Sequence, residues 1–245
     1  MSGCSEAVIL EMREVSREIV HNGRKLKTVD AVTCRFNRGG IYNIVGPSGA
    51  GKSSLLRLLN RLDESTSGEI RFKEKPIQSY PPVELRRKVA MLFQTPYLFP
   101  GTILENLKYC RPDRGDFDFL DHLNRVSLKP EVAEKDAGDL SVGEKQRVAL
   151  ARSLMLEPEV ILLDEPTSAL DPTSSKKIEE LILRLSRELS LTTITVTHSP
   201  EQALRLGGET LLLVGGRLIE TGPTSEILTR PRTEMGQKYI DRELS

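Results

Sequence analysis

The sequence has few of the features that mark secreted or disulfide-stabilised proteins. It contains no tryptophan, 4% aromatic residues and three cysteines among its 245 residues. The number of cysteines is odd, and the spacing of Cys4, Cys34 and Cys110 matches neither a metal site nor a CxxC motif. We therefore expect reduced thiols in a cytoplasmic protein.

The chain also lacks an excess of charge and a long apolar segment. Lys plus Arg equals Asp plus Glu, at 35 each, so no net charge favours a nucleic acid and no nucleic-acid partner is expected. No apolar run at the N-terminus resembles a signal peptide, and none approaches the ~20 residues that cross a bilayer. If the protein acts at a membrane, another chain must cross it.

Short apolar runs alternate with amphipathic segments along most of the sequence. The runs at 41–45 and 160–163 are almost continuously apolar, which is typical of parallel strands covered on both faces. The alternation predicts an α/β fold with a mainly parallel sheet. Further strands are expected at 8–12, 31–36, 89–93, 193–197 and 210–214, and helices at 52–59, 141–156, 174–189 and 201–206.

Residues 95–158 interrupt this alternation and are predicted to be mostly helical. We interpret them as a helical subdomain inserted between the core segments 1–94 and 159–245. The sequence contains no internal repeat, low-complexity tract or long linker, so these parts belong to a single domain, 1–245.

Residues 46–53 match the pattern G-x-x-x-x-G-K-[ST] between a predicted strand and a predicted helix. Glycines let backbone N–H groups approach phosphates, and the helix that begins near Lys52 directs its positive end at the same anion. Lys52 is expected to bridge the β- and γ-phosphates, and Ser53 to bind Mg²⁺. A glycine-rich turn without a ligand is the weaker alternative. The predicted ATP-binding residues here are Gly46, Pro47, Ser48, Gly49, Ala50, Gly51, Lys52, Ser53 and Ser54.

The apolar strand predicted at 160–163 ends in two carboxylates, Asp164 and Glu165. An acidic strand end alone is usually a solvated turn, but its combination with the phosphate loop favours a catalytic site. We expect Asp164 to hold Mg²⁺ through water and Glu165 to act as the general base for the attacking water.

The segment Leu-Ser-Val-Gly-Glu-Lys-Gln-Arg at 140–147 precedes an apolar helical pattern. Ser141 with Glu144 three residues later forms a capping-box pattern, so a purely structural helix start is one interpretation. The same start, with Gly143 beside it, offers N–H groups and a hydroxyl to an anion. We expect both properties, with Ser141 and Gly143 also binding ATP.

Together these motifs are similar to those of ATP-binding subunits of ABC transporters, and the resemblance extends over residues 8–231. It implies a P-loop NTPase fold with an N-terminal antiparallel β portion. It also implies that Gln94 contacts Mg²⁺ and water, that His198 contacts the γ-phosphate, and that residues 168–171 contact the opposite subunit. Gln94, Glu165 and His198 are thus the expected catalytic residues, and Ser53, Gln94 and Asp164 the expected metal site.

The resemblance further implies partners. The segment 140–147 corresponds to the family's signature, and the helix that follows it is the signature helix. In this family, each ATP is sandwiched between the phosphate loop of one subunit and the signature helix of a second copy, and hydrolysis opens the dimer. Membrane subunits contact the region after Gln94, where Tyr97, Leu98 and Phe99 stand in a predicted loop. The alternative is that these side chains pack inward on the helical subdomain. The protein is accordingly expected in the cytoplasm, peripheral on the inner face of a membrane.

The sequence departs from the family pattern at two places. The signature has Val142 and Glu144 where the family usually has glycine and glutamine. No aromatic residue stands where the family stacks adenine; Ile19 falls nearest, with His21 as a weaker candidate. Adenine is therefore expected to be held by apolar contact.

The cargo is the least constrained part of the interpretation. Residues 58–62 and those after 220 resemble small stand-alone subunits, which favours metal-ion export, with iron the leading cargo. Phosphate or other small-solute import is the alternative. A soluble ABC ATPase outside transport, and a regulatory module that does not hydrolyse ATP, are less favoured, the second because Glu165 and His198 are both present.

Overall fold

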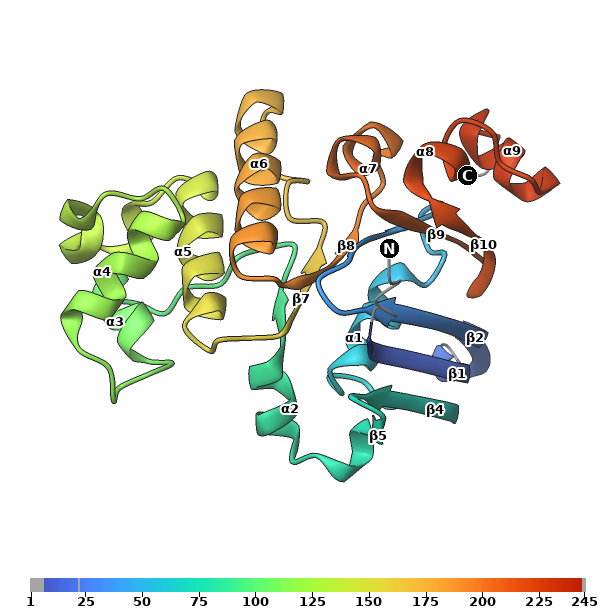
Figure 1. Cartoon of the computed structure of the whole chain (residues 1–245), viewed down its shortest axis with the longest axis horizontal. Helices are drawn as coiled ribbons and strands as arrows, with labels where there is room; N and C mark the ends of the chain where they lie inside the picture. The colour runs from blue at the N-terminus through green and yellow to red at the C-terminus, as the bar shows by residue number, and fades with distance from the viewer. Residues whose placement is uncertain (1–6, 22, 244–245) are drawn as a thin grey trace, which may run out of the picture.

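The computed structural model describes residues 7–21 and 23–243. Within these residues, the strands form two sheets, and a group of helices lies at the opposite end of the molecule from the N-terminal hairpin (Figure 1). No helix in this part of the chain is both long enough and apolar enough to cross a bilayer.

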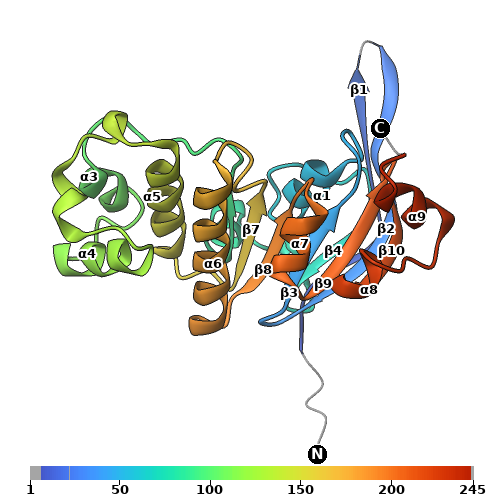
Figure 2. The ribbon, with the colours of Figure 1, turned by 90° about the horizontal axis from the view of Figure 1, so that it is seen from above.

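The first sheet is antiparallel, with the strand order β2-β1-β4-β5. β1 and β2 pair along almost their full length, and the outer half of this hairpin projects beyond the other elements (Figure 2). Positive φ angles at Glu14 and Ala31, of 49° and 51°, accompany irregularities in the β1 pairing. The strands are β1 (Val8–His21), β2 (Arg24–Asn37), β4 (Ser67–Phe72) and β5 (Lys75–Pro76).

The second sheet has the order β10-β9-β3-β8-β7-β6. Every neighbouring pair from β9 to β6 is parallel, and β10 adds an antiparallel edge, which confirms the predicted mainly parallel sheet. Its strands are β3 (Ile41–Val45), β6 (Val89–Leu92), β7 (Val160–Asp164), β8 (Thr192–Val196), β9 (Glu209–Val214) and β10 (Arg217–Pro223).

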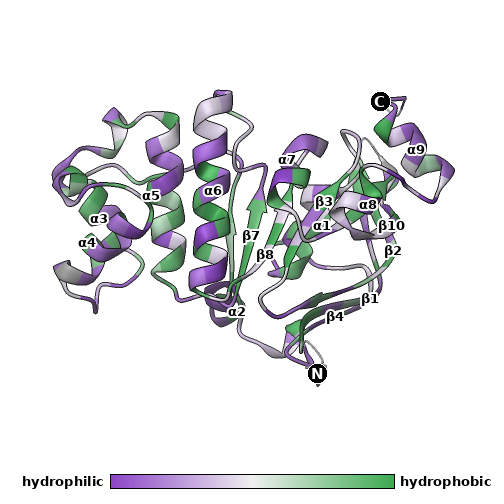
Figure 3. Cartoon of the chain, turned by 45° about the horizontal axis from the view of Figure 1, so that its top comes forward, coloured by the Kyte–Doolittle hydropathy of each residue, from purple (hydrophilic) through white to green (hydrophobic). Residues whose placement is uncertain are grey.

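Helices cover both faces of the parallel sheet. Alternate residues of β7 belong to different cores: Leu162 packs with α1 (Lys52–Leu59) and the antiparallel sheet, whereas Leu163 packs with α5 (Val142–Leu154) and α6 (Pro172–Glu188). Burial on both faces explains why β7 is apolar without alternation. Figure 3 shows the hydrophobic strands between helices whose outer faces are hydrophilic.

The segment between β6 and β7 carries its own apolar cluster. α3 (Ile103–Lys108), α4 (Asp116–Arg125) and α5 pack around Phe119, which is fully buried. Short 3₁₀ turns, η2 (Pro130–Glu134) and η3 (Ala137–Asp139), connect the helices. This arrangement agrees with a mostly helical insertion, while the subdomain boundaries stay a prediction.

The remaining helices are short. α7 (Pro200–Leu206), α8 (Thr224–Ile227) and α9 (Glu234–Ile240) form a small apolar cluster with β3 and β9. α2 (Pro82–Lys88) follows the 3₁₀ turn η1 (Ile77–Ser79) and leads into β6.

The apolar patterns located most of the sheet and its long helices, and the omissions have a common cause. Strands β4, β5 and β10 are edge-like or very short, and β4 places only Ile70 and Phe72 in the core. The outer half of the β1–β2 hairpin is largely polar. Helices α2, α8 and α9 have seven residues or fewer, too few to produce a strong helical period.

The buried ring of Phe119 provides a test of the helical cluster. Phe119→Ala is expected to lower the free energy of unfolding by about 3–5 kcal/mol, because it leaves a cavity. Urea denaturation measures this change. Phe93→Ala is the matched control, since Phe93 is 46% exposed and its truncation should cost roughly half as much or less. Equal losses for the two variants would contradict the packing described here.

Candidate functional site

The candidate site lies where three neighbouring parallel strands end. β3 leads into Gly46, β7 ends at Asp164, and β8 leads through Thr197 to His198. The carboxyl ends of parallel strands lie along one edge of a sheet, which is where open α/β folds bind ligands. Segments more than 100 residues apart in sequence therefore meet.

The phosphate loop requires glycine at two positions for steric reasons. Gly46 has a φ of 151°, and a β-carbon there would lie 2.0 Å from the carbonyl oxygen of Leu213. Gly51 has a φ of 97°, and a β-carbon there would lie 2.0 Å from the carbonyl oxygen of Thr28. Both conformations are strained for residues with side chains, so these glycines fix the course of the loop.

α1 begins directly after the loop with its first-turn N–H groups facing the site. Gly51 is the N-cap, no side chain caps the helix, and its first turn contains no acidic residue. The positive end of the helix is therefore not neutralised from within the first turn, which suits a phosphate.

Lys52 is 4% exposed and lies at the centre of the site. Its Nζ donates to the carbonyl oxygens of Gly46 and Pro47, each at 2.8 Å, and lies 3.2 Å from Nδ1 of His198. Burial lowers the pKa of Lys52, while the carboxylates Glu165 and Asp164 act in the opposite direction. Hydrogen bonds thus fix Lys52 to the same loop that is expected to bind the phosphates.

Ser53 and Asp164 form a pair of oxygen ligands beside Lys52. The Ser53 hydroxyl donates to Oδ1 of Asp164 at 2.8 Å, and Asp164 is 5% exposed. A hydroxyl and a carboxylate at this separation fit Mg²⁺, a hard cation that prefers oxygen ligands. The residues predicted to bind the metal from these two segments are therefore adjacent.

Glu165 is held in an uncommon backbone conformation, with a φ of 47°. Its N–H donates to the carbonyl of Val196 at 3.0 Å, so the turn after β7 is attached to the end of β8. Positive φ at a glutamate is unfavourable and often marks a functional position. Here it directs the carboxylate toward the end of the neighbouring strand.

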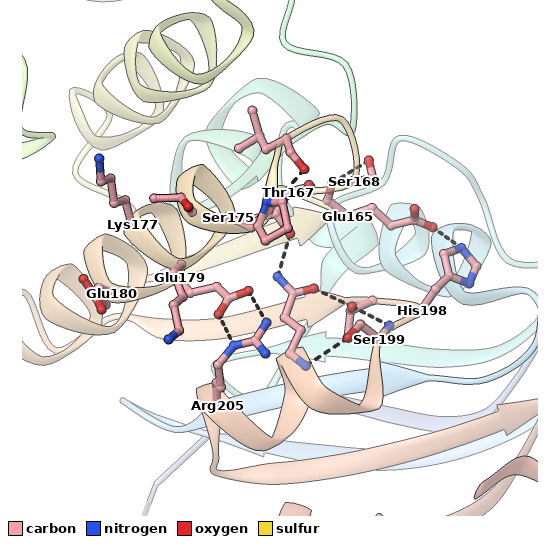
Figure 4. Close-up of a pocket in the computed structure, with 16 residues that line it drawn as sticks. Glu165, Thr167, Ser168, Ser175, Lys177, Glu179, Glu180, His198, Ser199 and Arg205 are labelled. Carbon is pink, nitrogen blue, oxygen red and sulfur yellow. Dashed lines mark hydrogen bonds and ion pairs between the residues drawn. The ribbon is translucent and has the colours of Figure 1, made fainter. Parts of the chain in front are cut away.

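The Glu165 side chain contacts both other predicted catalytic residues. Oε1 of Glu165 pairs with Nε2 of His198 (Figure 4), and Oε2 accepts from the Gln94 amide at 3.3 Å. Because Nδ1 of His198 faces the Lys52 ammonium, we assign its proton to Nε2, which then donates to the carboxylate. Gln94, Glu165, His198 and Lys52 thus form one continuous chain of contacts.

Gln94 contacts a second residue beside Glu165. Its Nε2 also donates to Oγ of Ser168 at 3.2 Å, and this hydroxyl donates to the Glu165 carbonyl at 3.1 Å. From the sequence, Ser168 was expected only to contact the opposite subunit. Its contacts within the same chain could not be inferred from the motif.

A cleft of about 860 Å³ opens beside Glu165 and His198, between α6 and α7 (Figure 4). Thr167, Gln202 and Arg205 contribute to its wall. The lining residues do not include the phosphate loop. The cleft is therefore a neighbour of the nucleotide site, not the site itself.

The signature segment is well formed but stands apart from the phosphate loop. Ser141 caps α5 by accepting from the N–H of Glu144, whose carboxylate accepts from the Ser141 N–H at 2.9 Å, which confirms the predicted capping box. The Ser141 hydroxyl also donates to this carboxylate at 2.7 Å, and that bond is the main cause that lowers the pKa of Glu144. α6 stands between α5 and the central strands (Figure 2).

Val142 and Gly143 complete the start of α5. Val142 is 46% exposed, and a β-carbon at Gly143 would lie 3.7 Å from Cδ2 of Leu170. The Val142 side chain therefore lies at the surface and does not cover the N-terminus of α5. A cavity of about 250 Å³ lies here between Ser141, Gly143 and Asp171.

The predicted adenine contact lies in the long hairpin. Ile19 on β1 pairs with Leu26 on β2 and is half-buried. The side chain of His21, the weaker candidate, lies outside the described part of the chain, as does Cys4. The two described cysteines, Cys34 and Cys110, are free thiols, and burial raises the pKa of Cys34 to about 12.

Comparison with known proteins identifies the family. The family description "ABC transporter" matches residues 29–168, more than half of the chain. The chain belongs to the ABC transporter ATPase family. It is an ATP-binding subunit that hydrolyses ATP, and its fold is that of a P-loop ABC cassette.

Curated relatives match along most of the chain. Protein STAR1 of Oryza sativa subsp. japonica is 44% identical over 83% of this chain, which spans 60% of the rice protein's length. ABC transporter I family member 17 of Arabidopsis thaliana is 39% identical, with 94% of this chain and 88% of that protein covered. Phosphate import ATP-binding protein PstB 1 of Enterococcus faecalis is 39% identical, with 88% and 92% covered.

Solved structures share the fold over nearly the whole chain. The chain resembles cbiO1 from Clostridium perfringens, described as part of the ABC transporter complex cbiONQ, with a TM-score of 0.83, 27% identity and coverage of 97% and 94%. It resembles the ATP-binding cassette MJ0796, a dimer bound to ADP and Pi, with a TM-score of 0.79, 28% identity and coverage of 88% and 99%.

Lys52→Ala is expected to abolish ATP binding, because the phosphates lose the cation that the loop holds in place. Isothermal titration with ATP measures the affinity. Lys176→Ala is the control, since Lys176 is an exposed lysine in the neighbouring cleft and its loss should leave the affinity within about twofold. An unchanged ATP affinity in Lys52→Ala would refute the assignment of the phosphate site.

Proposed function

We propose that Glu165 is the general base of ATP hydrolysis. The observation that carries this proposal is the placement of its carboxylate between Gln94 and His198, one residue after Asp164. Glu165 accepts a proton from the attacking water as the water oxygen bonds to the γ-phosphorus. The bond from that phosphorus to the β–γ bridging oxygen breaks, and ADP and phosphate leave.

Other residues of the site hold the substrate and the metal. Lys52 neutralises the β- and γ-phosphates, with N–H groups of the loop and of α1 as further donors. Ser53, Asp164 and Gln94 would hold Mg²⁺, which neutralises charge on the phosphate oxygens when bound. His198 donates through Nε2, first to Glu165 and then to the γ-phosphate. The adjacency of Ser53 and Asp164 supports this division of roles.

The complete site requires a second copy of the chain. Ser141 and Gly143 lie at the start of α5, separated by α6 from the phosphate loop of their own chain (Figure 2). In a head-to-tail dimer, this helix start covers the γ-phosphate held by the other copy. The dimer described for MJ0796 with ADP and Pi supports this arrangement. ATP drives closure because it bridges the two copies only in the closed state.

The chain works as one ABC ATPase domain, with 95–158 as its helical subdomain, attached to separate membrane subunits. Such attachment places it in the cytoplasm at the inner face of the membrane. The naming of cbiO1 as part of a transporter complex supports this proposal.

The surface that follows Gln94 suits a membrane partner, although only part of it is exposed. Tyr97 is 66% exposed, whereas Leu98 packs against the helical cluster. The ring of Phe99 lies 5.6 Å from that of Tyr97 and has Arg152 over it at 5.4 Å. The two interpretations of this segment therefore apply to different residues: Leu98 and Phe99 support the fold, and Tyr97 faces the partner.

The membrane subunits, and not this chain, determine which cargo is transported. Metal-ion export, with iron as the leading cargo, stays our first prediction, and phosphate import is the alternative. Relatives named as phosphate import subunits match over 84–95% of the chain at 37–41% identity, which gives the alternative specific support. Identification of the membrane protein that co-purifies from detergent extracts distinguishes the two.

Glu165→Gln is expected to bind ATP normally but to hydrolyse it ~10²–10⁴-fold more slowly, because an amide cannot accept the water proton. The trapped ATP should hold a dimer that size-exclusion chromatography resolves. Glu180→Gln, which changes an exposed glutamate of the same cleft, should hydrolyse ATP at the normal rate. Normal hydrolysis by Glu165→Gln would exclude Glu165 as the base.

Tyr97→Ala is expected to weaken attachment to the membrane subunits several-fold while leaving ATP affinity unchanged, because its ring is exposed and Tyr97 is not one of the proposed phosphate-binding residues 46–54. Retention of the chain on washed membranes measures attachment. Leu204→Ala on α7, another exposed apolar position, serves as the control. Full retention of Tyr97→Ala would remove this residue from the interface.

A further inference from the structure

A buried glutamine connects the segment that follows Glu165 with the segment that surrounds His198. The amide nitrogen of Gln202 donates to Oγ1 of Thr167 at 2.8 Å. Its amide oxygen accepts from Oγ1 of Thr197 at 2.5 Å. Gln202 is 5% exposed and Thr197 is 2% exposed, so both hydrogen bonds form largely away from solvent.

The backbone around Gln202 fixes the position of its amide. Its N–H donates to Oγ of Ser199, the N-cap of α7, at 3.1 Å, and the Ser199 N–H donates to Oγ1 of Thr197 at 3.0 Å (Figure 4). The hydroxyls of Thr167 and Thr197 satisfy the two ends of the amide, one as acceptor and the other as donor. The side chain is therefore fixed at both ends and at its base.

α7 is itself held in place against α6. Arg205 forms a bidentate pair with the buried Glu179 of α6, through contacts of 2.6 and 2.9 Å. Such paired contacts restrict orientation as well as distance. Gln202 consequently extends from a helix held against α6 toward the two segments that carry Glu165 and His198.

We propose that Gln202 is a positioning residue for ATP hydrolysis, which fixes the Glu165 carboxylate relative to the His198 ring by joining Thr167 to Thr197. The direct contact between Glu165 and His198 is on the open side of the site, where the His198 side chain is 47% exposed. The Gln202 connection supports the same two segments from the buried side. This inference rests on the catalytic roles proposed for Glu165 and His198.

The position of Gln202 also predicts which kinetic constant it affects. Within the described residues, its hydrogen bonds go to Thr167, Thr197 and Ser199, and none goes to residues 46–54, which bind the phosphates in the proposed function. A misplaced general base slows the chemical step without weakening substrate binding. Loss of the connection should therefore lower kcat and leave the ATP KM nearly unchanged.

The test compares Gln202→Met, Thr167→Val and Thr167→Ser in the full chain, using steady-state ATPase assays and thermal denaturation. Methionine and valine keep the side-chain volume but break the connection, the first at Gln202 itself and the second at its Thr167 end. Each should lower kcat between about 10-fold and 100-fold, the range for a catalytic group displaced by up to 1 Å, with KM within about twofold. Thr167→Ser keeps the hydroxyl and should restore most of kcat. The double variant, Gln202→Met with Thr167→Val, should lose no more kcat than either single variant loses.

Ser186→Ala is the matched control for the loss of buried hydrogen bonds. Ser186 is 4% exposed and bonds to Ile182 and Thr193, both at 2.7 Å, at the far end of α6. Ser186→Ala and Gln202→Met should both lower Tm, but Ser186→Ala should leave kcat unchanged. A normal kcat in Gln202→Met, multiplied losses in the double variant, or an equal kcat loss in Ser186→Ala would each overturn the proposal.

The outcome is distinguishable from a failure of the proposed function. If Glu165→Gln is inactive and Gln202→Met is fully active, the general base stands and only the positioning role is refuted. If Gln202→Met proves too unstable to assay, the Thr167→Val and Thr167→Ser pair decides alone, because a valine loss without serine rescue also refutes the role.

Discussion

The burial of one positive charge, the ammonium of Lys52, constrains the arrangement of the whole site. Removing an ammonium from water costs on the order of several kcal/mol unless opposite charges and hydrogen-bond acceptors replace the water. Here the acceptors come from the loop after β3, and the carboxylates come from the end of β7. A third contact, from His198, comes from the end of β8. The strand order that places these three ends side by side is therefore also the order that makes burial of the lysine tolerable.

Uncommon backbone conformations accompany that same charge. Gly46 and Gly51 take conformations in which a β-carbon would collide with a neighbouring carbonyl, and Glu165 takes a positive φ despite its side chain. The surrounding sheet compensates, since the Glu165 N–H is bonded to Val196 and β7 is buried on both faces. A rigid parallel sheet thus supports three unfavourable turns that direct their functional groups toward one point.

The sequence predicted the parts of this design that depend on local pattern. The apolar runs located β3 and β7, the capping box located the start of α5, and the glycine spacing located the phosphate loop, because each is encoded in neighbouring residues. The contacts of Ser168 and Gln202 were not predicted, since they depend on which distant segments the fold brings together. Strand β10 was missed because it is an edge strand with only two neighbouring apolar residues, Leu218 and Ile219, beside polar ones and Gly222 and Pro223. The prediction for residues 97–99 treated as a unit a segment in which Tyr97 is exposed while Leu98 packs against the helical cluster.

The segment after β7 also touches the signature helix of its own chain, and this contact bears on how two sites in a dimer act together. The hydroxyl and backbone of Ser168 bond to Glu165, the Leu170 N–H bonds to Thr167, and the Leu170 side chain packs beside Gly143 and against the helical cluster. In the proposed dimer, Gly143 covers the ATP held by the other copy, whereas Glu165 acts on the ATP of its own. Within one chain, a few packed residues therefore connect Glu165 with the wall of the second site. Because these residues belong to a single short loop, the fold of each chain links the two ATP sites of the proposed dimer through contacts as well as through the interface.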